Sequence, residues 1–204
     1  MPDHSAIGST APGCYGTGET PLVSLRETTI AAAWNIQGKP EKPAFLEQVL
    51  ATFGTALPLA PNTTLASDAL SALWLGPESW LLVAGGPLSP GHPLTDFAAR
   101  RDALNAAGGA VFDVSTSRVA WTLAGPRATS VLASGCPLDF HPRAFPPGTC
   151  AQSLFGHVNA LFCRGADGEF TMLVARSFGR DLWATLCAAS AQHGYEVLAP
   201  GPFR

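Results

Sequence analysis

The segment SRVAWTLAG, Ser117–Gly125, repeats a pattern that the chain first shows in TIAAAWNIQG, Thr29–Gly38. In both segments apolar residues recur at every second position, which is the period of a half-buried strand. Both also contain a tryptophan, an aliphatic residue two positions later and a glycine two positions after that. This repeated strand predicts that the chain consists of two halves built to one plan.

We expect a helix after each of these strands. The first, residues 43–54, carries apolar residues at helical spacing and ends at Gly54, where a C′ glycine is typical. The second, residues 126–135, begins with Pro126 at the expected N1 position. Each helix then leads into a Pro-Leu step, so the two halves also share the way in which the chain leaves the helix.

Two strands joined by a turn, a second helix and a short final strand complete each half. In the first half these segments are ALWLG, SWLLVAG, TDFAARRDALNAAGG and AVFDV; in the second they are FGHVNALFC, EFTMLVA, SFGRDLWATLCAASAQHG and YEVLA. We expect Phe178, Leu182 and Leu186 to form the buried stripe of the last helix. The pattern predicts an α+β fold in which two ferredoxin-like β-α-β-β-α-β halves form a pseudo-repeat, with antiparallel sheets and helices on one face.

This plan divides the chain into three parts. Residues 1–20 are rich in Gly, Ser, Thr and Pro, and we expect them to form a flexible N-terminal arm. Residues 21–115 form the predicted first half and residues 116–204 the second.

The composition excludes several classes of protein. Only 13% of the residues are charged, about half the usual fraction of roughly 25%, and 47% are hydrophobic. Such a chain has a large core or an apolar surface that a partner covers. The net charge of −3 and scattered arginines do not suit a nucleic-acid-binding protein. Without a signal peptide or a long apolar run, we expect a cytoplasmic protein with no membrane association.

The stretch GCPLDFHPRAFPPG, residues 135–148, gathers the residue types of a catalytic or metal site. Cys136, His141 and Cys150, with Asp139 as a fourth ligand, could bind zinc, and Cys136 could act as a nucleophile with His141 as its base. The ligand spacing C-x4-H-x8-C does not match the tight pairs of structural zinc sites, however. The five cysteines of the chain are odd in number and lack a Cys-x-x-Cys pair, which favours reduced, mostly buried thiols.

The first-half counterpart of this stretch, LPLAP at residues 57–61, contains no titratable residue. The Pro-Leu step therefore serves the path of the backbone, because proline cannot continue a helix. We favour a proline-stiffened loop in which Asp139 bonds to Arg143 or to the backbone, and in which His141 and Arg143 contact a partner.

No other segment offers a convincing site. Asp113 in FDVSTSR ends a strand, where its expected role is to cap a turn; an acid-base role would need a partner group that the sequence does not identify. We therefore assign no catalytic, cofactor-binding or metal-binding residue to this chain.

Three stretches carry a resemblance to a known family: ALWLGPESWLLVAGG, GGAVFDVSTSRVAWTLAGPRATSVLASGCPLDFHPRAFPPGTCAQSLFGHVNALF and FTMLVARSFGRDLWATL. Together they resemble the gamma subunit of heterotetrameric sarcosine oxidase over roughly residues 20 to 200. The second half is also distantly similar to the first domain of glycine-cleavage T-protein and of the tRNA-modification GTPase family. The strand, Gly-Pro step and helix from Val119 to Leu132 carry this second likeness.

The resemblance implies a non-catalytic subunit that works with alpha, beta and delta subunits. Such a complex oxidatively demethylates sarcosine to glycine, transfers the one-carbon unit to tetrahydrofolate and produces hydrogen peroxide. FAD, FMN, NAD, tetrahydrofolate and zinc are then expected in the partner subunits and not in this chain. The alternatives are the equivalent subunit of a related N-methyl amino acid dehydrogenase, a stand-alone folate-binding one-carbon transfer protein, and a thiol or metal enzyme that uses Cys136 and His141.

Overall fold

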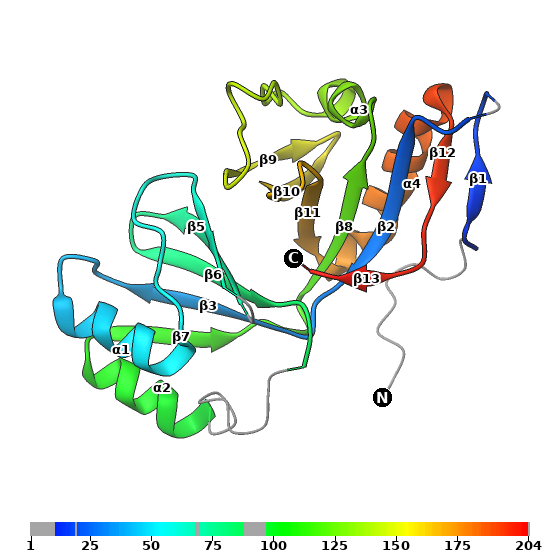
Figure 1. Cartoon of the computed structure of the whole chain (residues 1–204). Coiled ribbons are helices and arrows are strands. Elements are labelled where there is room, and N and C mark those ends of the chain that lie inside the picture. The colour runs from blue at the N-terminus through cyan, green and yellow to red at the C-terminus, as the bar shows by residue number, and fades with distance from the viewer. Residues whose placement is uncertain (1–10, 19, 68–69, 88–96, 204) are drawn as a thin grey trace. The chain divides into compact units, whose positions relative to one another are not determined.

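The computed structural model describes residues 11–18, 20–67, 70–87 and 97–203, and the chain divides into two compact units (Figure 1). Of the described residues, unit 1 contains those up to Thr29 together with Ser117–Gly201, and unit 2 contains those from Ile30 to Thr116 together with Pro202 and Phe203. The predicted boundary lies between residues 115 and 116, and in the structure the chain passes from unit 2 back to unit 1 after Thr116. Residues 21–29, predicted in the first half, belong to the unit of the second half.

Unit 2 contains an antiparallel sheet of five strands in the order β4-β5-β6-β3-β7. Its strands are β3 (Ala32–Gly38), β4 (Thr64–Ala66), β5 (Ser71–Gly76), β6 (Ser79–Ala84) and β7 (Gly109–Asp113), and its helices are α1 (Pro43–Phe53) and α2 (Phe97–Ala106). Gly54 has a φ of 66° and its N–H bonds to Leu50 O, so the predicted C′ glycine is confirmed.

The core of unit 2 lies between its helices and one face of its sheet. Phe45, Val49 and Phe53 of α1 pack with Trp34 of β3 and Trp80 of β6, among other buried residues. The predicted helical spacing of α1 is therefore the spacing of its buried stripe. The period of two in β3 likewise directs its tryptophan and isoleucine to this one core.

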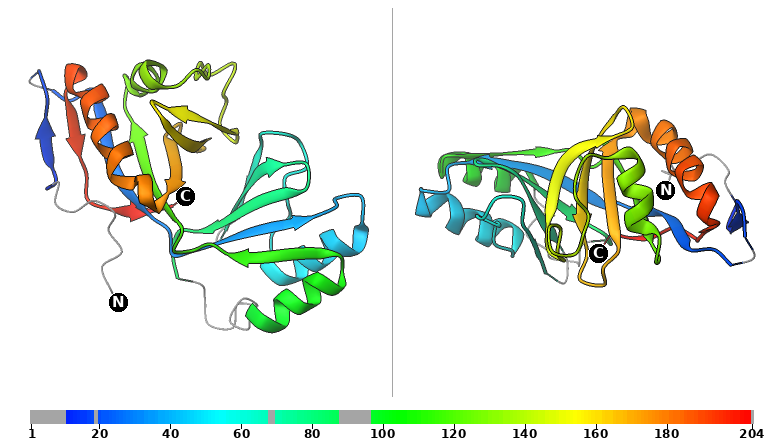
Figure 2. Two further views of the ribbon diagram at one scale, coloured as in Figure 1. Left: turned by 180° about the vertical axis from the view of Figure 1, so that it is seen from behind. Right: turned by 90° about the horizontal axis from the view of Figure 1, so that it is seen from above.

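Unit 1 contains a larger sheet in the order β1-β12-β2-β8-β11-β10-β9, with β13 paired to β2. Its strands are β1 (Gly13–Tyr15), β2 (Val23–Thr29), β8 (Arg118–Ala124), β9 (Cys150–Phe155), β10 (Val158–Arg164), β11 (Phe170–Ala175) and β12 (Tyr195–Val197). The short strand β13 (Gly201–Pro202) begins at the last residue of this unit. Its helices are α3 (Ala128–Gly135) and α4 (Gly179–Ser190), with 3-10 turns η2 (Arg176–Phe178) and η3 (Ala191–His193). Both helices pack on the sheet face that carries Trp121, and Figures 1 and 2 show α4 lying along β12 and β2.

The place of β2 corrects the predicted plan of the second half. The predicted final strand forms as β12, but it pairs in parallel with β2, and β2 pairs antiparallel with β8. The sequence pattern did not show this insertion because strand partners are fixed by long-range packing. Val23 and Leu25 of β2 are buried in the core of unit 1, so this strand completes the core of the second half.

Three further expectations need correction. Part of the predicted flexible arm, Gly13–Tyr15, forms β1 and pairs with β12, while residues 1–10 lie outside the described residues. Pro126 precedes the N-cap residue Arg127 and is not the first residue of α3. Phe178 is 45% exposed, because it ends the 3-10 turn η2 and does not continue the buried stripe of α4.

Candidate functional site

The loop that follows α3, residues 136–149, is anchored by two phenylalanines. Phe140 and Phe145 are buried in the core of unit 1, and their ring centres lie 5.4 Å apart. Phe140 also lies 5.3 Å from Phe162 of β10 and 5.6 Å from Phe170 of β11. These spacings are those of favourable aromatic pairs, so apolar contacts hold the loop. The titratable residues of the loop did not predict these contacts.

Arg164, at the end of β10, holds the same loop through its side chain and backbone. Its Nη1 donates a hydrogen bond of 2.8 Å to Phe145 O, and its guanidinium carbon lies 5.0 Å from the centre of the Phe170 ring. Its carbonyl oxygen accepts a bond of 2.9 Å from Gly148 N–H. The arginine therefore ties the end of the loop to the sheet.

The polar residues of the loop bond to the backbone nearby. Asp139 Oδ1 accepts a bond of 2.8 Å from the backbone N–H of His141, and His141 Nδ1 accepts one of 3.2 Å from the backbone N–H of Arg143. All three residues are exposed. The backbone alternative for Asp139 is the one observed, and the loop presents the imidazole and the guanidinium at the surface of unit 1.

The structure does not bring together the residues considered for zinc or thiol chemistry. Cys136 and Cys150 are buried, whereas His141 is exposed. Cys136 donates its backbone N–H to Leu132 O at the end of α3 and packs in the core of unit 1. Within the described ranges, no group of three or more His, Cys, Asp or Glu residues could hold a metal ion.

Cys150 lies directly opposite Cys163 in the antiparallel pair of β9 and β10. Neither forms a disulfide. Burial, followed by the neighbouring Cys150, raises the pKa of the Cys163 thiol well above its usual value. This thiol is therefore protonated and poorly nucleophilic at neutral pH.

The first-half counterpart, Leu57–Pro61, has the same architectural role without polar side chains. Leu57 is buried, and Pro58 O accepts a bond of 2.8 Å from the indole N–H of Trp80. In both halves, therefore, a side chain from the sheet donates a hydrogen bond to a backbone carbonyl of the loop that follows the helix. The donor is Trp80 in the first half and Arg164 in the second. Asp113, the remaining candidate, accepts bonds from the backbone N–H and the hydroxyl of Ser115, as expected of a turn cap.

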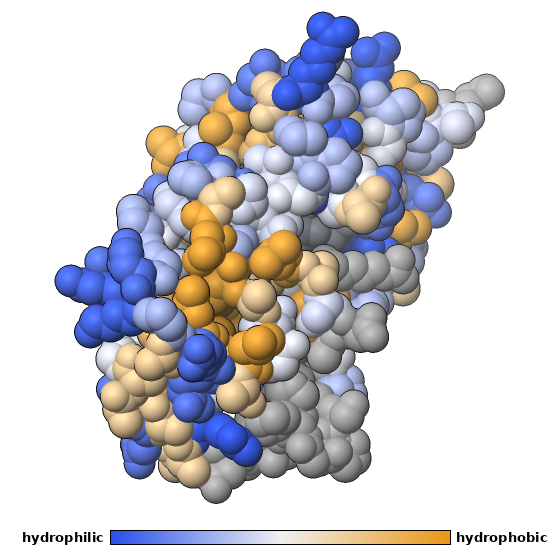
Figure 3. Space-filling view, turned by 60° about the vertical axis from the view of Figure 1, so that its left-hand side comes forward, coloured by the Kyte–Doolittle hydropathy of each residue, from blue (hydrophilic) through white to orange (hydrophobic). Residues whose placement is uncertain are grey.

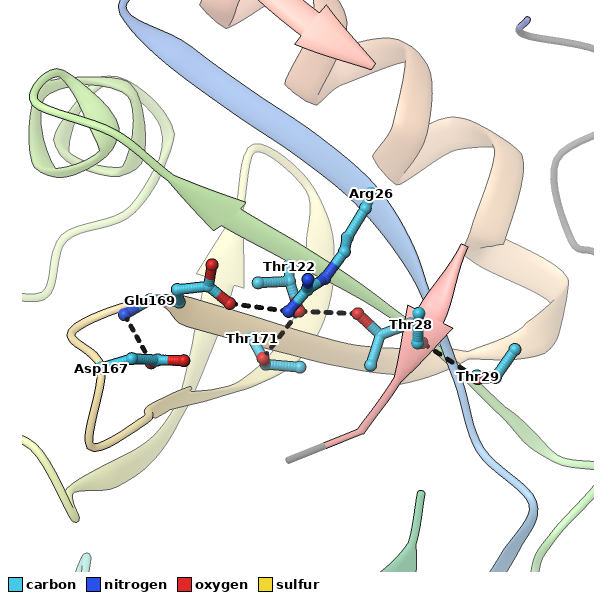
Figure 4. A network of polar contacts seen from close by, with 8 residues as sticks. Arg26, Thr28, Thr29, Thr122, Asp167, Glu169 and Thr171 are labelled. Carbon is cyan, nitrogen blue, oxygen red and sulfur yellow. Dashed lines mark hydrogen bonds and ion pairs between the residues drawn. The ribbon is translucent and has the colours of Figure 1, made fainter. Parts of the chain in front are cut away.

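A polar network crosses the sheet face of unit 1 that lies away from α3 and α4 (Figure 4). The hydroxyl oxygens of Thr28, Thr122 and Thr171 form a ladder with spacings of 2.6 and 3.0 Å across β2, β8 and β11. Beside it, Arg26 Nη2 lies 2.7 Å from Glu169 Oε2. These bonds join the inserted strand β2 to the strands of the second half and fix its register.

Two tyrosines mark the outer edge of the same sheet. The rings of Tyr15 in β1 and Tyr195 in β12 stack with centres 5.5 Å apart. Desolvation, with smaller contributions from the neighbouring Cys187 and Tyr15, raises the pKa of Tyr195 to about 12. This side chain is therefore neutral at physiological pH and is not a candidate base.

Several large hydrophobic side chains are exposed. Figure 3 shows a face on which hydrophobic side chains gather, with hydrophilic ones beside them. Exposed leucines in unit 2 include Leu50 of α1, Leu59 of the following loop and Leu65 of β4. None of the described helices is long and apolar enough to cross a membrane.

The comparisons with known proteins agree with one another. The chain matches the family described as "Sarcosine oxidase, gamma subunit family" over residues 37–192. It is 30% identical to sarcosine oxidase subunit gamma of Arthrobacter sp over 152 residues, which cover 74% of this chain and 71% of that one. It is 29% identical to the same subunit of Corynebacterium sp. (strain U-96) over 157 residues, which cover 76% of this chain and 73% of that one.

Solved structures similar to most of the chain include the following two. One is the heterotetrameric sarcosine oxidase from Corynebacterium sp. U-96 in complex with pyrrole 2-carboxylate, with a TM-score of 0.73, 27% identity and coverage of 88% of each chain. The other is the glycine cleavage system aminomethyltransferase T from Bartonella henselae, with a TM-score of 0.58 and 18% identity. The match covers 89% of this chain and 48% of the aminomethyltransferase, and it shows a shared fold alone.

Proposed function

Because this chain belongs to the sarcosine oxidase gamma subunit family, we propose that it is the gamma subunit of a heterotetrameric sarcosine oxidase and contributes to assembly. The family match over residues 37–192 carries this proposal. The structural similarity over 88% of both chains supports it, because the likeness extends over both units.

The proposed partners are alpha, beta and delta subunits, and the reaction of the complex is the oxidative demethylation of sarcosine to glycine. In this proposal the one-carbon unit passes to tetrahydrofolate and oxygen is reduced to hydrogen peroxide. FAD, FMN, NAD, tetrahydrofolate and zinc are proposed to bind to the partner subunits. These assignments rest on the family resemblance and not on a site in this chain.

The proposed role of this chain is non-catalytic. Cys136, which the sequence analysis considered as a nucleophile, is buried in the core, whereas His141 is exposed. The low proportion of charged residues supports a role in contacts between subunits.

His141 and Arg143 are the proposed partner contacts of the loop. Both are exposed, and the backbone beneath them is fixed by Phe140, Phe145 and Arg164. A loop that is rigid before binding loses little conformational entropy on association. An arginine on such a loop can form bidentate bonds to a partner carboxylate.

The proposed ferredoxin-like pseudo-repeat has support from the strand orders. In unit 2 the strand after α2 pairs with the strand before α1, and a hairpin lies on the other side. In unit 1 the hairpin of β10 and β11 lies beside β8 in the same way. The inserted β2 and the outer β12 are where the second copy departs from the plan.

Co-expression with the neighbouring subunits tests the proposed function. An affinity tag on a partner subunit should recover this chain together with flavin absorbance. If the tagged complex assembled with its flavin and left this chain behind, the proposal would fail. Calorimetry of the isolated chain with tetrahydrofolate addresses the stand-alone folate protein; the gamma-subunit role predicts no tight binding.

A further inference from the structure

Cys150 and Cys163 face each other across the last two strands of the larger sheet. They lie directly opposite in the antiparallel pair of β9 and β10, and β9 is the edge strand of that sheet. Their neighbours Phe162 and Ala151 pack in and against the core of unit 1, and side chains alternate between the two faces of a strand. Both thiols therefore lie on the face away from that core, and both are buried there.

The backbone hydrogen bonds identify the kind of strand pair. Arg164 N–H donates a bond of 3.0 Å to Thr149 O, and bonded and non-bonded pairs alternate along an antiparallel ladder. The next pair along, Cys150 and Cys163, is therefore a non-hydrogen-bonded pair, in which the Cα atoms typically lie about 4.5 Å apart. A disulfide spans a Cα separation of about 4.4 to 6.8 Å, so the two cysteines can be joined without a movement of the backbone.

The two thiols also interact with each other. After burial, the charge of Cys150 is the second cause that raises the pKa of Cys163, so the two sulfur atoms lie within electrostatic reach. A disulfide needs only these two atoms, whereas a structural zinc site needs four ligands. The described ranges contain no group of three or more His, Cys, Asp or Glu residues that could hold a metal ion. Disulfide chemistry is therefore the chemistry that this pair fits.

The other three cysteines lie elsewhere in unit 1. Cys136 packs in the core on the opposite face of the sheet, and Cys14 lies in β1 at the opposite edge. Cys187 belongs to α4 and is hydrogen-bonded to Tyr195. Among the five cysteines, all of which the structure describes, the register therefore selects one pair.

We propose that Cys150 and Cys163 form a redox-active dithiol that hydrogen peroxide oxidises to a cross-strand disulfide. In the first step the O–O bond of the peroxide breaks, one thiol becomes a sulfenic acid and one water leaves. In the second step the sulfur of the other thiol displaces the hydroxyl group of the sulfenic acid, the S–S bond forms and a second water leaves. The two thiols lose two electrons and two protons in total, and one peroxide is reduced to two waters.

The rate of this reaction depends on opening of the edge strand. The thiols are buried and the Cys163 thiol is protonated at neutral pH, so the fully closed pair reacts slowly. Opening at the start of β9 exposes Cys150, because edge elements open at a lower free energy than the core. The reaction that we propose for the complex produces hydrogen peroxide, although the dithiol itself is a property of this chain alone.

The disulfide would fix the end of the loop of residues 136–149. It lies next to Arg164, whose side chain donates to Phe145 O and whose backbone bonds to Thr149 and Gly148. Joined strands cannot separate at this end, so oxidation would hold the loop against the sheet more firmly.

Oxidation of the folded, full-length chain tests the proposal. The chain is incubated with excess hydrogen peroxide, the peroxide is removed with catalase, and the denatured protein is alkylated and digested for mass spectrometry. We expect a cross-linked pair of peptides containing Cys150 and Cys163, lighter by two hydrogen atoms than the sum of the reduced peptides and released by dithiothreitol. Exchange of the Arg164 N–H hydrogen should become at least about tenfold slower in the oxidised chain.

Matched variants separate this pair from the other thiols. Cys150→Ala and Cys163→Ala should each abolish the cross-link and the slower exchange. Cys136→Ala also removes a buried thiol of unit 1, but on the opposite face, and it should leave both results unchanged. Circular dichroism of each variant checks that it remains folded, and the mapping of the wild-type chain does not depend on any variant.

Two results would overturn the proposal. In the first, the exposed Cys14 is oxidised, which shows that the peroxide is effective, while Cys150 and Cys163 both remain reduced. In the second, the cross-link forms only in urea, or either cysteine joins another thiol in preference to its strand partner. Neither result bears on the proposed function, and a failure of the chain to enter a complex would leave the dithiol chemistry intact.

Discussion

The anchoring of the loop by Phe140 predicts a large and specific loss of stability in Phe140→Ala. The ring is buried and has three aromatic neighbours within 5.6 Å. Truncation of a buried phenylalanine costs about 3 to 5 kcal/mol, and the three ring pairs place this site near about 4 kcal/mol. Phe140→Leu keeps much of the volume but loses the ring pairs, so we expect about 2 kcal/mol.

Urea unfolding of the full chain, followed by near-ultraviolet circular dichroism and tryptophan fluorescence, measures both losses. His141→Ala and Arg143→Ala are the controls, and each should change the free energy of unfolding by less than about 0.5 kcal/mol because both side chains are exposed. The reasoning would be refuted if Phe140→Ala cost less than about 1 kcal/mol while His141→Ala cost more. The polar residues, and not the aromatic ones, would then hold the loop.

Three further predictions follow from close contacts and buried groups. Gly85→Ala should lower the melting temperature, because a Cβ there would overlap the backbone of Phe203, whereas Gly86→Ala meets no atom within 4 Å and should have little effect. Tyr195 should remain mostly protonated at pH 11 in an absorbance titration at 295 nm, because its pKa is raised to about 12. This raised pKa contributes stability that is present below the unfolded pKa of about 10 and is lost as the pH rises toward 12. Cys187→Ala should lower the pKa of Tyr195 in the folded chain. The exposed Cys14 should react rapidly with a thiol reagent, whereas the buried Cys163, whose pKa is raised, should react only after unfolding; rapid labelling of Cys163 in the folded chain would contradict its placement.

Local periodicity was enough to predict most of the strands and helices. The alternation around Trp34 and Trp121 predicted β3 and β8, and the position of Gly54 predicted the end of α1. These features depend on neighbouring residues, so they can be read from a single sequence. The hairpins of β5 with β6 and of β10 with β11 are equally local.

The partners of β2 and the anchors of the loop depend instead on distant contacts. Arg26 meets Glu169 across 143 positions of the sequence, and no local pattern links them. In the loop, the sequence analysis considered Cys136 and His141 and did not predict that Phe140 and Phe145 are buried. The sequence did contain an indication of their burial, because two aromatic residues in a short proline-rich loop of a poorly charged chain need a core to pack against.

Whether this chain is an assembly subunit is tested most directly by size-exclusion chromatography with light scattering after co-expression with the alpha, beta and delta subunits. We predict that the chain elutes in one peak with them, in equimolar amount and at the mass of a heterotetramer, and that flavin absorbance follows the same peak. Elution of the chain at its monomer mass of 21.1 kDa, apart from a complete flavin-containing complex of the other subunits, would contradict the proposed role.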